Sequence, residues 1–546
     1  MPRALRRLLP TDQWTRALLV PALVFIATAL DRNYQTDLWH HLARGRAMVA
    51  EGRLVDTDRF TYTVAGQPFQ DANWGWQVVF YRLYAAGGLP LVQTANSATL
   101  ALMAAVLVGL AWRRSGSLAA AAGVGVLTFF GLRQMLIIRP QTFSLLLFVL
   151  LYATLEAGWG RRGWLLFPPL LLAVWANVHG GFPVGLILIG CYVLAAAVST
   201  GEEAPATEHV SRVGFGRPSV FLRHIWPSAL AVPGKGAGAG PEQGGGAAPI
   251  RWPAVARRAM PWALCLLASL AATLANPYGW RVYQYVGLTS HTASARHIDE
   301  WLPPGLGLLA GKVWVLSLVL MLVLFALPGR RPTRRELCLA CCFLPLACGS
   351  VRMVAWWLLV SAPLLAAQLA ARWPKARAAE EAARAPSCGA ATACAALLAA
   401  AALSLPWFER YNPVLALPGR GHRTESDLQA AADHLAAGPR GGRVYTRFAW
   451  GEYLGWSLAP RYTVFMDGRI EIFPDAVWEQ YSAVTRGRGD WEEILARYGV
   501  DCLLLDTTGY HHDLLPLVRQ RPSAWQQTFQ KGNLVLFERQ RQVAGR

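Results

Sequence analysis

The sequence predicts a mainly α-helical protein that crosses a membrane many times and ends in a small α/β domain. Of its 546 residues, 54% are hydrophobic and only 16% are charged, and the mean hydropathy is +0.28. Soluble domains carry about 25% charged residues, so this composition indicates a polytopic membrane protein. From about residue 406 the chain becomes more polar, which predicts a separate soluble domain over residues 406–546.

Eleven apolar runs predict the transmembrane helices, since a span needs about 20 apolar residues. We therefore expect about eleven spans in a transmembrane domain over residues 1–405. The first run also fits a cleaved signal peptide with an A-x-A site at Ala27–Ala29, and both interpretations place Asp31 outside the cytoplasm. The runs lie at 17–30, 91–112, 118–138, 142–157, 164–178, 182–199, 260–275, 311–328, 336–350, 353–371 and 389–405.

Arginine clusters in the loops predict the orientation. They all fall on the side of Met1, which the positive-inside rule makes cytoplasmic, and the tail then lies on the outer face. The same clusters account for the net charge of +19, and no basic face with interleaved aromatics indicates nucleic-acid binding. One of these loops, residues 200–259, is rich in Gly, Ala and Pro, and we expect it to be a disordered cytoplasmic insertion. The clusters lie at 113–114, 161–162, 200–259, 329–336 and 371–384.

Polar residues gather at the opposite, outer face. The loop over residues 31–76 contributes Asp37, His40 and further acids, and its Leu38–Val49 pattern predicts an interfacial helix. Later loops add the other polar residues to the same face. Ionisable groups at a membrane edge are costly and are functional candidates by default. These later residues are Arg139, His179, Glu300 and Arg352.

Each candidate also has an ordinary structural interpretation. Asp37 fits a helix cap as well as a general base or metal ligand. The pair Asp56 and Asp58 favours turn chemistry over a metal site, and His179 fits a helix end as well as a substrate ligand. Arg139 and Arg352 lie on the outer side, against the positive-inside bias. A lipid phosphate or pyrophosphate, which arginine can bind bidentately, explains at least one of them better than snorkelling does.

The tail alternates strand-like and helix-like segments, which is typical of an α/β domain. Strands are predicted at Arg443–Phe448, Tyr462–Met466, Cys502–Leu505 and Asn533–Glu538. Helices are predicted at Asp427–Ala436, Ala476–Val484 and Trp491–Tyr498.

Two stretches resemble GT-C-fold glycosyltransferases, which are polytopic enzymes with polyprenyl-linked sugar donors. Residues 36–52, TDLWHHLARGRAMVAEG, and residues 66–84 are similar to the first loop of lipid A aminoarabinose and protein mannosyl transferases. The acid that follows in that family is Leu38 here, and DANW replaces its KPP-type turn. Trp450, Glu452 and Tyr453 resemble the WWDYG region that binds acceptor peptide in oligosaccharyltransferase catalytic subunits.

This resemblance implies a sugar transfer from a polyprenyl-phosphate donor at the periplasmic face of a bacterial inner membrane. The acceptor would be a glycan, a lipid or a protein. Asp37 would be the catalytic base or would bind a divalent metal, Mg²⁺ or Mn²⁺, although no cofactor is certain. A lipid-linked-sugar transporter or a non-catalytic scaffold remains the alternative. In the transferase, Arg139 and Arg352 would hold the donor phosphate, His40, His179 and Glu300 would line the site, and Trp450, Asp467 and Arg469 would lie on the acceptor side.

Overall fold

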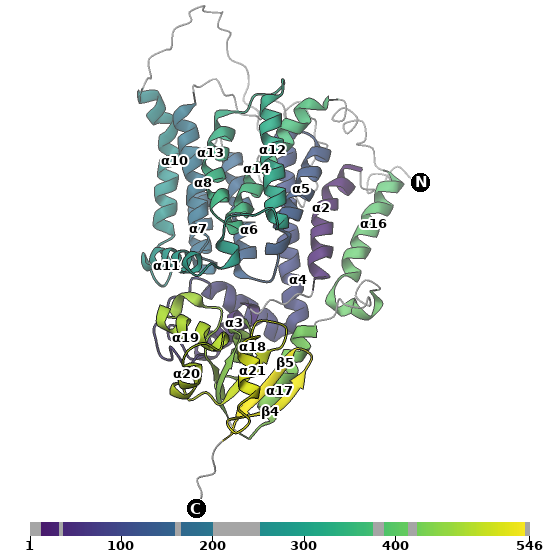
Figure 1. Ribbon diagram of the computed structural model, residues 1–546. Coiled ribbons are helices and arrows are strands. Elements are labelled where there is room, and N and C mark those ends of the chain that lie inside the picture. Colours follow the sequence, from purple (N-terminus) through teal and green to yellow (C-terminus); the bar gives the residue numbers. More distant parts are fainter. Residues whose placement is uncertain are drawn as a thin grey trace, which may run out of the picture.

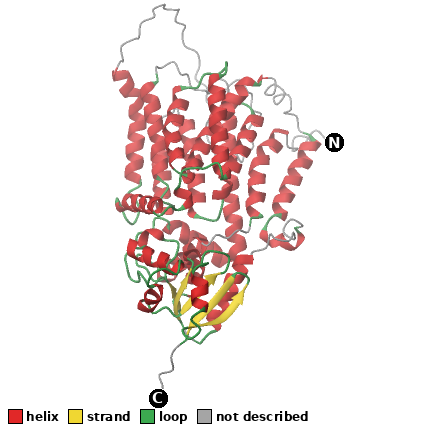
Figure 2. Cartoon of the chain, viewed as in Figure 1, coloured by secondary structure: helices red, strands yellow, loops and turns green. Residues whose placement is uncertain are grey.

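The protein consists of a helical bundle with a smaller α/β domain packed against one end, as a computed structural model shows (Figures 1 and 2). The strands lie together in the C-terminal domain, and long helices run side by side through the bundle. The structure describes residues 12–31, 37–158, 165–199, 252–374, 387–412, 423–439 and 441–540.

Each predicted apolar run coincides with a helix of the bundle. Six helices of the described chain are long and apolar enough to cross a bilayer, and four shorter apolar helices accompany them. The multi-pass architecture is therefore confirmed, while the count of eleven spans stays a prediction. The bundle helices are α2 (Asp12–Ala29), α4 (Trp74–Ser115), α5 (Leu118–Leu132), α6 (Pro140–Gly158), α7 (Phe167–Val178), α8 (Pro183–Val198), α10 (Trp252–Ala272), α12 (Leu309–Ala326), α13 (Arg334–Gly349), α14 (Val351–Arg372) and α16 (Cys388–Leu403).

Helix α14 forms the centre of the bundle. Its residues are buried over almost the whole length, and it contacts α4, α5, α12 and α13. Because its first turn lies at the end of the bundle next to the α/β domain, a side chain there can face that domain. Arg352 occupies this first turn.

Helix α4 changes direction at Gly87–Gly88, where the backbone leaves helical geometry. Gly88 has a φ of 64°, which glycine adopts without a steric penalty. Pro90 follows and lacks a backbone N–H, so it suits the start of the second segment. The part before this kink packs against α3 (Asp37–Glu51), the helix predicted for the first loop.

Short elements cover the same end of the bundle. Helix α11 (Arg281–Ala295) lies across the bundle axis there (Figure 1). The 3-10 turns η1 (Arg133–Met135), η4 (Asp299–Trp301) and η5 (Pro406–Tyr411) complete the outer loops. Most of the predicted insertion, residues 200–251, lies outside the described residues, and residues 252–259 form the first turns of α10.

The α/β domain is built on a five-stranded sheet in the order β2-β1-β3-β5-β4. Strands β2, β1 and β3 are parallel, while β5 and β4 add as antiparallel strands. Two apolar cores lie against the sheet, one around Tyr445 and Phe465 and one around Trp450 and Val444. The elements are β1 (Gly442–Thr446), β2 (Tyr462–Val464), β3 (Cys502–Asp506), β4 (Trp525–Lys531) and β5 (Leu534–Arg539), with α17 (Arg423–Ala437), α18 (Phe448–Leu458), η6 (Ile470–Ile472), α19 (Asp475–Thr485), α20 (Trp491–Arg497) and α21 (Leu514–Arg519).

The first loop and the α/β domain are joined through backbone and side chains. The backbone N–H of Tyr62 donates to the carbonyl of Val464 at 3.1 Å, and the N–H of Val464 donates to the carbonyl of Phe60 at 3.1 Å. Helix α18 packs on α3, where Arg46 donates to the carbonyl of Trp456 at 2.7 Å. These contacts fix the position of the domain against the bundle end.

Candidate functional site

A cavity of about 480 Å³ lies where the bundle end meets the α/β domain. Its lining residues come from α3, the loop before α6, the α7–α8 turn, the α11–η4 segment, α14 and the α/β domain. Five predicted site residues share this lining although up to 315 positions separate them in the sequence (37 to 352). These five are Asp37, Arg139, His179, Glu300 and Arg352.

Arg139 is the central cation of the cavity, because it contacts two carboxylates. Its Nε lies 2.7 Å from Oδ2 of Asp37, the first residue of α3, and its Nη1 donates to Oε1 of Glu300 at 2.6 Å. Burial raises the pKa of Glu300, but Arg139 and Arg352 outweigh burial and hold that pKa below its ordinary value. The Asp37–Arg139–Glu300 chain is therefore a charged triad, and it is partly open to the cavity.

Arg352 lies beside this triad but, unlike Arg139, forms no ion pair with a described residue. Its guanidinium carbon lies 5.2 Å from the ring centroid of Trp301, a cation–π geometry that orients the group. Among the described residues, no hydrogen bond or ion pair holds the guanidinium. Arg352 therefore offers its N–H donors to whatever enters the cavity.

His179 ends helix α7 and also lines the cavity. Its Nδ1 lies 2.6 Å from the Ser144 hydroxyl and accepts from the Gly181 N–H at 3.0 Å. Burial lowers the pKa of His179 to about 3, with Arg352 and Arg139 adding to the effect. The imidazole is thus neutral at physiological pH, so His179 contributes polarity and shape rather than charge.

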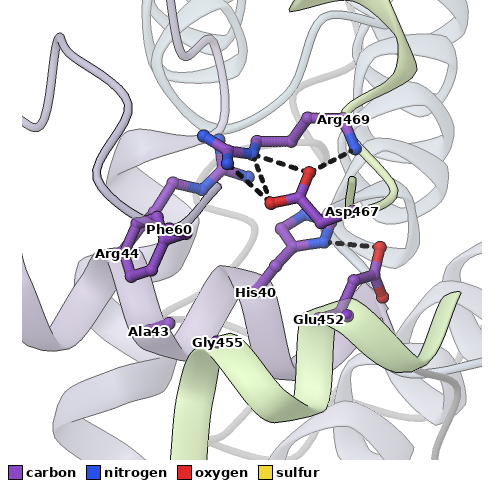
Figure 3. A pocket seen from close by; sticks show the side chains of 9 residues that line it. His40, Ala43, Arg44, Phe60, Glu452, Gly455, Asp467 and Arg469 are labelled. Atoms are coloured by element: carbon purple, nitrogen blue, oxygen red, sulfur yellow. Dashed lines mark hydrogen bonds and ion pairs between the residues drawn. The ribbon is translucent and has the colours of Figure 1, made fainter. Parts of the chain in front are cut away.

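His40 lies behind the cavity wall and supports it. Its Nδ1 lies 2.9 Å from Oε1 of Glu452, whose side chain is 1% exposed. Figure 3 shows this contact, with His40 rising from α3 and Glu452 from α18. Burial lowers the pKa of His40 well below its ordinary value, and His41 and Arg44 lower it further. Glu452 itself lines the cavity, so His40 positions a lining residue across the domain boundary.

Asp467 and Arg469 form a sealed ion cluster with Asp58 of the first loop (Figure 3 shows the Asp467–Arg469 part). Arg469 Nη2 lies 2.6 Å from Oδ2 of Asp467 and also pairs with Asp58, and all three side chains are at most 3% exposed. Asp58 accepts from the Thr61 N–H at 3.1 Å, as in the predicted turn. The cluster fastens the first loop to the α/β domain and lies outside the cavity lining.

Trp450 also lies away from the cavity. It is 5% exposed and packs in the core of the α/β domain with Leu428 and Leu536. The helix α18 turns Trp450 inwards and Glu452 towards the cavity, because residues two apart lie on different faces of a helix. None of the predicted acceptor-side residues Trp450, Asp467 and Arg469 is therefore part of the cavity lining.

The lining also contains residues that were not predicted, among them His41, Trp301, Glu452 and Glu471. Burial raises the pKa of the Glu471 carboxyl. His41 is backed by a buried network in which Arg44 Nη1 lies 2.7 Å from Oδ2 of Asp71, and Gln77 donates to Asp71 at 2.9 Å. Two features of the sequence could have indicated these residues. His41 directly follows the predicted site residue His40, and Glu452 is the acid of the WGEY motif.

The described residues form no ready-made metal site. Within them, no group of three or more His, Cys, Asp or Glu side chains comes together. Asp37 is paired with the cation Arg139 rather than with a second carboxylate. A divalent metal, Mg²⁺ or Mn²⁺, at Asp37 therefore stays a prediction.

Comparison with known proteins identifies the fold. No family model matches the chain, and no curated protein matches it. The apo crystal structure of the Archaeoglobus fulgidus oligosaccharyltransferase matches with a TM-score of 0.55 and 12% identity, over 90% of this chain and 69% of that one. The archaeal oligosaccharyltransferase AglB from the same organism, in complex with an inhibitory peptide and a dolichol-phosphate, matches with a TM-score of 0.53 and 13% identity over the same shares.

A third match covers nearly all of both chains. ArnT from Cupriavidus metallidurans, bound to undecaprenyl phosphate, has a TM-score of 0.47 and 15% identity over 98% of this chain and 99% of that one. The two oligosaccharyltransferase matches have the GT-C architecture, and this chain has the GT-C fold. The resemblance found in the sequence is confirmed at the level of the fold.

Proposed function

We propose that the protein is a membrane glycosyltransferase that moves a sugar from a polyprenyl-phosphate donor to an acceptor at the outer face of the membrane. One observation carries this proposal: the cavity combines a carboxylate, Asp37, with the guanidinium of Arg352, which no described residue holds. A transferase of this kind needs a base for the acceptor and a cation for the departing phosphate.

The proposed reaction uses these groups in one displacement. The acceptor hydroxyl oxygen attacks the anomeric carbon, and Asp37 takes the hydroxyl proton. The bond between the anomeric carbon and the phosphate oxygen breaks, and its electron pair stays on the phosphate. Arg352, with Arg139 beside it, stabilises the charge that develops there. Glu452 and Glu471, on the wall formed by the α/β domain, would face the acceptor.

The fold and the site position support this assignment. AglB, whose fold this chain shares, has been described in complex with a dolichol-phosphate, which is a lipid phosphate, and with an inhibitory peptide. The cavity lies where the bundle meets the α/β domain, and a lipid phosphate bound there would lie at headgroup depth. By the positive-inside rule that end of the bundle would be periplasmic and the N-terminus cytoplasmic, and we place the protein in a bacterial inner membrane.

The experiment compares two acids of the first loop. The wild type, Asp37→Asn and Asp56→Asn would be expressed in a deletion strain, and cell-surface glycans would be measured by mass spectrometry at equal membrane abundance. Asp56 is the matched control, since its side chain is 64% exposed and lies outside the cavity lining. We expect the wild type and Asp56→Asn to restore a glycan, while Asp37→Asn loses at least ~100-fold, as for removal of a general base.

Full restoration by Asp37→Asn would contradict the catalytic role. The transporter or scaffold alternative would then replace the transferase.

A further inference from the structure

The charges around the cavity are unequally available to a ligand. Arg139 already contacts Asp37 through Nε and Glu300 through Nη1, at 2.7 and 2.6 Å. The guanidinium of Arg352 is the one lining guanidinium without a hydrogen bond or ion pair to a described residue. Together these two cations and two carboxylates sum to zero.

The rest of the lining contains no further arginine or lysine. His179 is neutral because its pKa is lowered to about 3, and burial, with Arg44 adding to it, also lowers the pKa of His41 well below its ordinary value. The α/β domain contributes Glu452 and Glu471 to the opposite wall. A ligand with several negative charges would therefore find few positive charges in the cavity that are not already neutralised by a carboxylate.

Glu300 is the carboxylate that reduces the positive charge available to a ligand phosphate. It lies in η4, two residues before which the chain turns at His297, whose φ of 54° is unusual for a non-glycine residue. The residue after Glu300, Trp301, makes the cation–π contact with Arg352. The side chain of Glu300 is 35% exposed, so it faces the cavity rather than a packed core. Glu300 thus occupies an anion position on Arg139 that a ligand phosphate could otherwise take.

We propose that Glu300 determines donor specificity: by neutralising Arg139, it restricts the site to lipids with a single phosphate and disfavours pyrophosphate-linked donors. This inference rests on the proposed function and adds to it the residue that excludes pyrophosphate-linked donors. A pyrophosphate carries at least one more negative charge than the corresponding phosphate and brings it next to Glu300. The repulsion is strong in a partly buried site, where charges are poorly screened. Specificity of this kind depends on a repulsive element as well as on attraction.

The experiment is a competition between two lipids that contain no sugar. Each kind of donor leaves one of them behind after transfer, undecaprenyl phosphate or undecaprenyl pyrophosphate. The detergent-purified full chain would be mixed with equal concentrations of both, and the bound fractions measured by native mass spectrometry. EDTA would be present so that no divalent ion shields the second phosphate.

The wild type, Glu300→Gln and the control Asp299→Asn would be compared. Glutamine keeps the shape and a hydrogen bond to Arg139 but not the charge. Asp299 is the adjacent acid, also in the cavity lining, with no ion pair to a described residue. Thermal unfolding of each variant would establish that it is folded.

We expect the wild type to prefer undecaprenyl phosphate by at least ~10-fold, a difference of about 1.4 kcal/mol. Glu300→Gln should reduce this preference to about twofold or less, through tighter pyrophosphate binding, while Asp299→Asn keeps most of it. Equal binding of both lipids by the wild type, an unchanged preference in Glu300→Gln, or an equal loss in Asp299→Asn would overturn the role of Glu300 alone. If the wild type binds neither lipid, the donor assignment falls too.

Discussion

Two groups of charged residues join the first loop to other parts of the molecule, and they differ in how far their side chains are exposed to solvent. In the Asp58–Asp467–Arg469 cluster, every side chain is at most 3% exposed and both carboxylates contact the guanidinium. In the cavity, Asp37 and Glu300 are 32% and 35% exposed, and Arg352 stacks only on a ring. A sealed cluster holds parts of a protein together, whereas an open one can bind something else.

The largest expected effect is a loss of stability when the buried Asp58–Asp467–Arg469 cluster is broken. Arg469→Met would leave two buried carboxylates without their cation, and breaking a buried ion pair in this way costs about 3–5 kcal/mol. We expect a much lower melting temperature in detergent and faster proteolysis of the α/β domain.

A triple variant sharpens this test. Adding Asp58→Asn and Asp467→Asn to Arg469→Met removes the unpaired charges, so much of the stability should return. A melting temperature of Arg469→Met that equals the wild-type value would show that the cluster does not fasten the loop.

The second effect concerns activity instead. Arg352→Gln should lower the rate of transfer by about 10²–10³, as the loss of one charge-stabilising donor does in other enzymes. Its melting temperature should stay close to that of the wild type, because no described residue pairs with the guanidinium. A stability loss as large as that of Arg469→Met would place Arg352 among the fastening residues and contradict the comparison.

The third effect is a dependence on pH. Because the pKa of His179 is lowered to about 3 in the folded protein, the unfolded chain binds more protons between that value and about 6.5. Stability should therefore fall as the pH decreases from about 6.5 towards 3. His179→Gln should flatten this decline in melting temperature, and an identical decline in the variant would show that His179 does not contribute.

The smallest effect tests the backbone beside Glu300. His297 has a φ of 54°, which costs a non-glycine residue about 1 kcal/mol or more. His297→Gly should relieve this cost, offset by the greater entropy of glycine in the unfolded chain. We expect a change in the free energy of unfolding within about 1 kcal/mol of zero, measured by thermal unfolding with the wild type as reference.

The fold was largely predictable from the sequence because apolar runs of membrane length specify helices almost independently of context. The α/β domain was harder. β4 was missed because Trp525–Lys531 is a mostly exposed edge strand of polar residues, and α18 because its two glycines and a motif-like pattern obscured a helix. Such elements depend on tertiary contacts rather than on local pattern.

The lining of the cavity was predictable in part, for a physical reason. Asp37, Arg139, His179, Glu300 and Arg352 were found because charged and polar groups at membrane helix ends are costly. Glu471 and Glu452 were not predicted as lining residues. The contact between Glu452 and His40 could not be inferred from the sequence because 412 positions separate the two residues. Nor does a sequence distinguish a sealed pair such as Asp467–Arg469 from an open one, because the difference lies in solvent access.

The most direct test of the central claim is to map where the lipid phosphate binds. An undecaprenyl phosphate analogue with a diazirine next to the phosphate would be photolysed with the purified full chain, and labelled peptides identified by mass spectrometry. We predict labelling around Trp301 and Arg352 that Arg352→Gln reduces and excess undecaprenyl phosphate prevents. Labelling around Arg469, or labelling unchanged by Arg352→Gln, would contradict the assignment of the open cavity as the donor site.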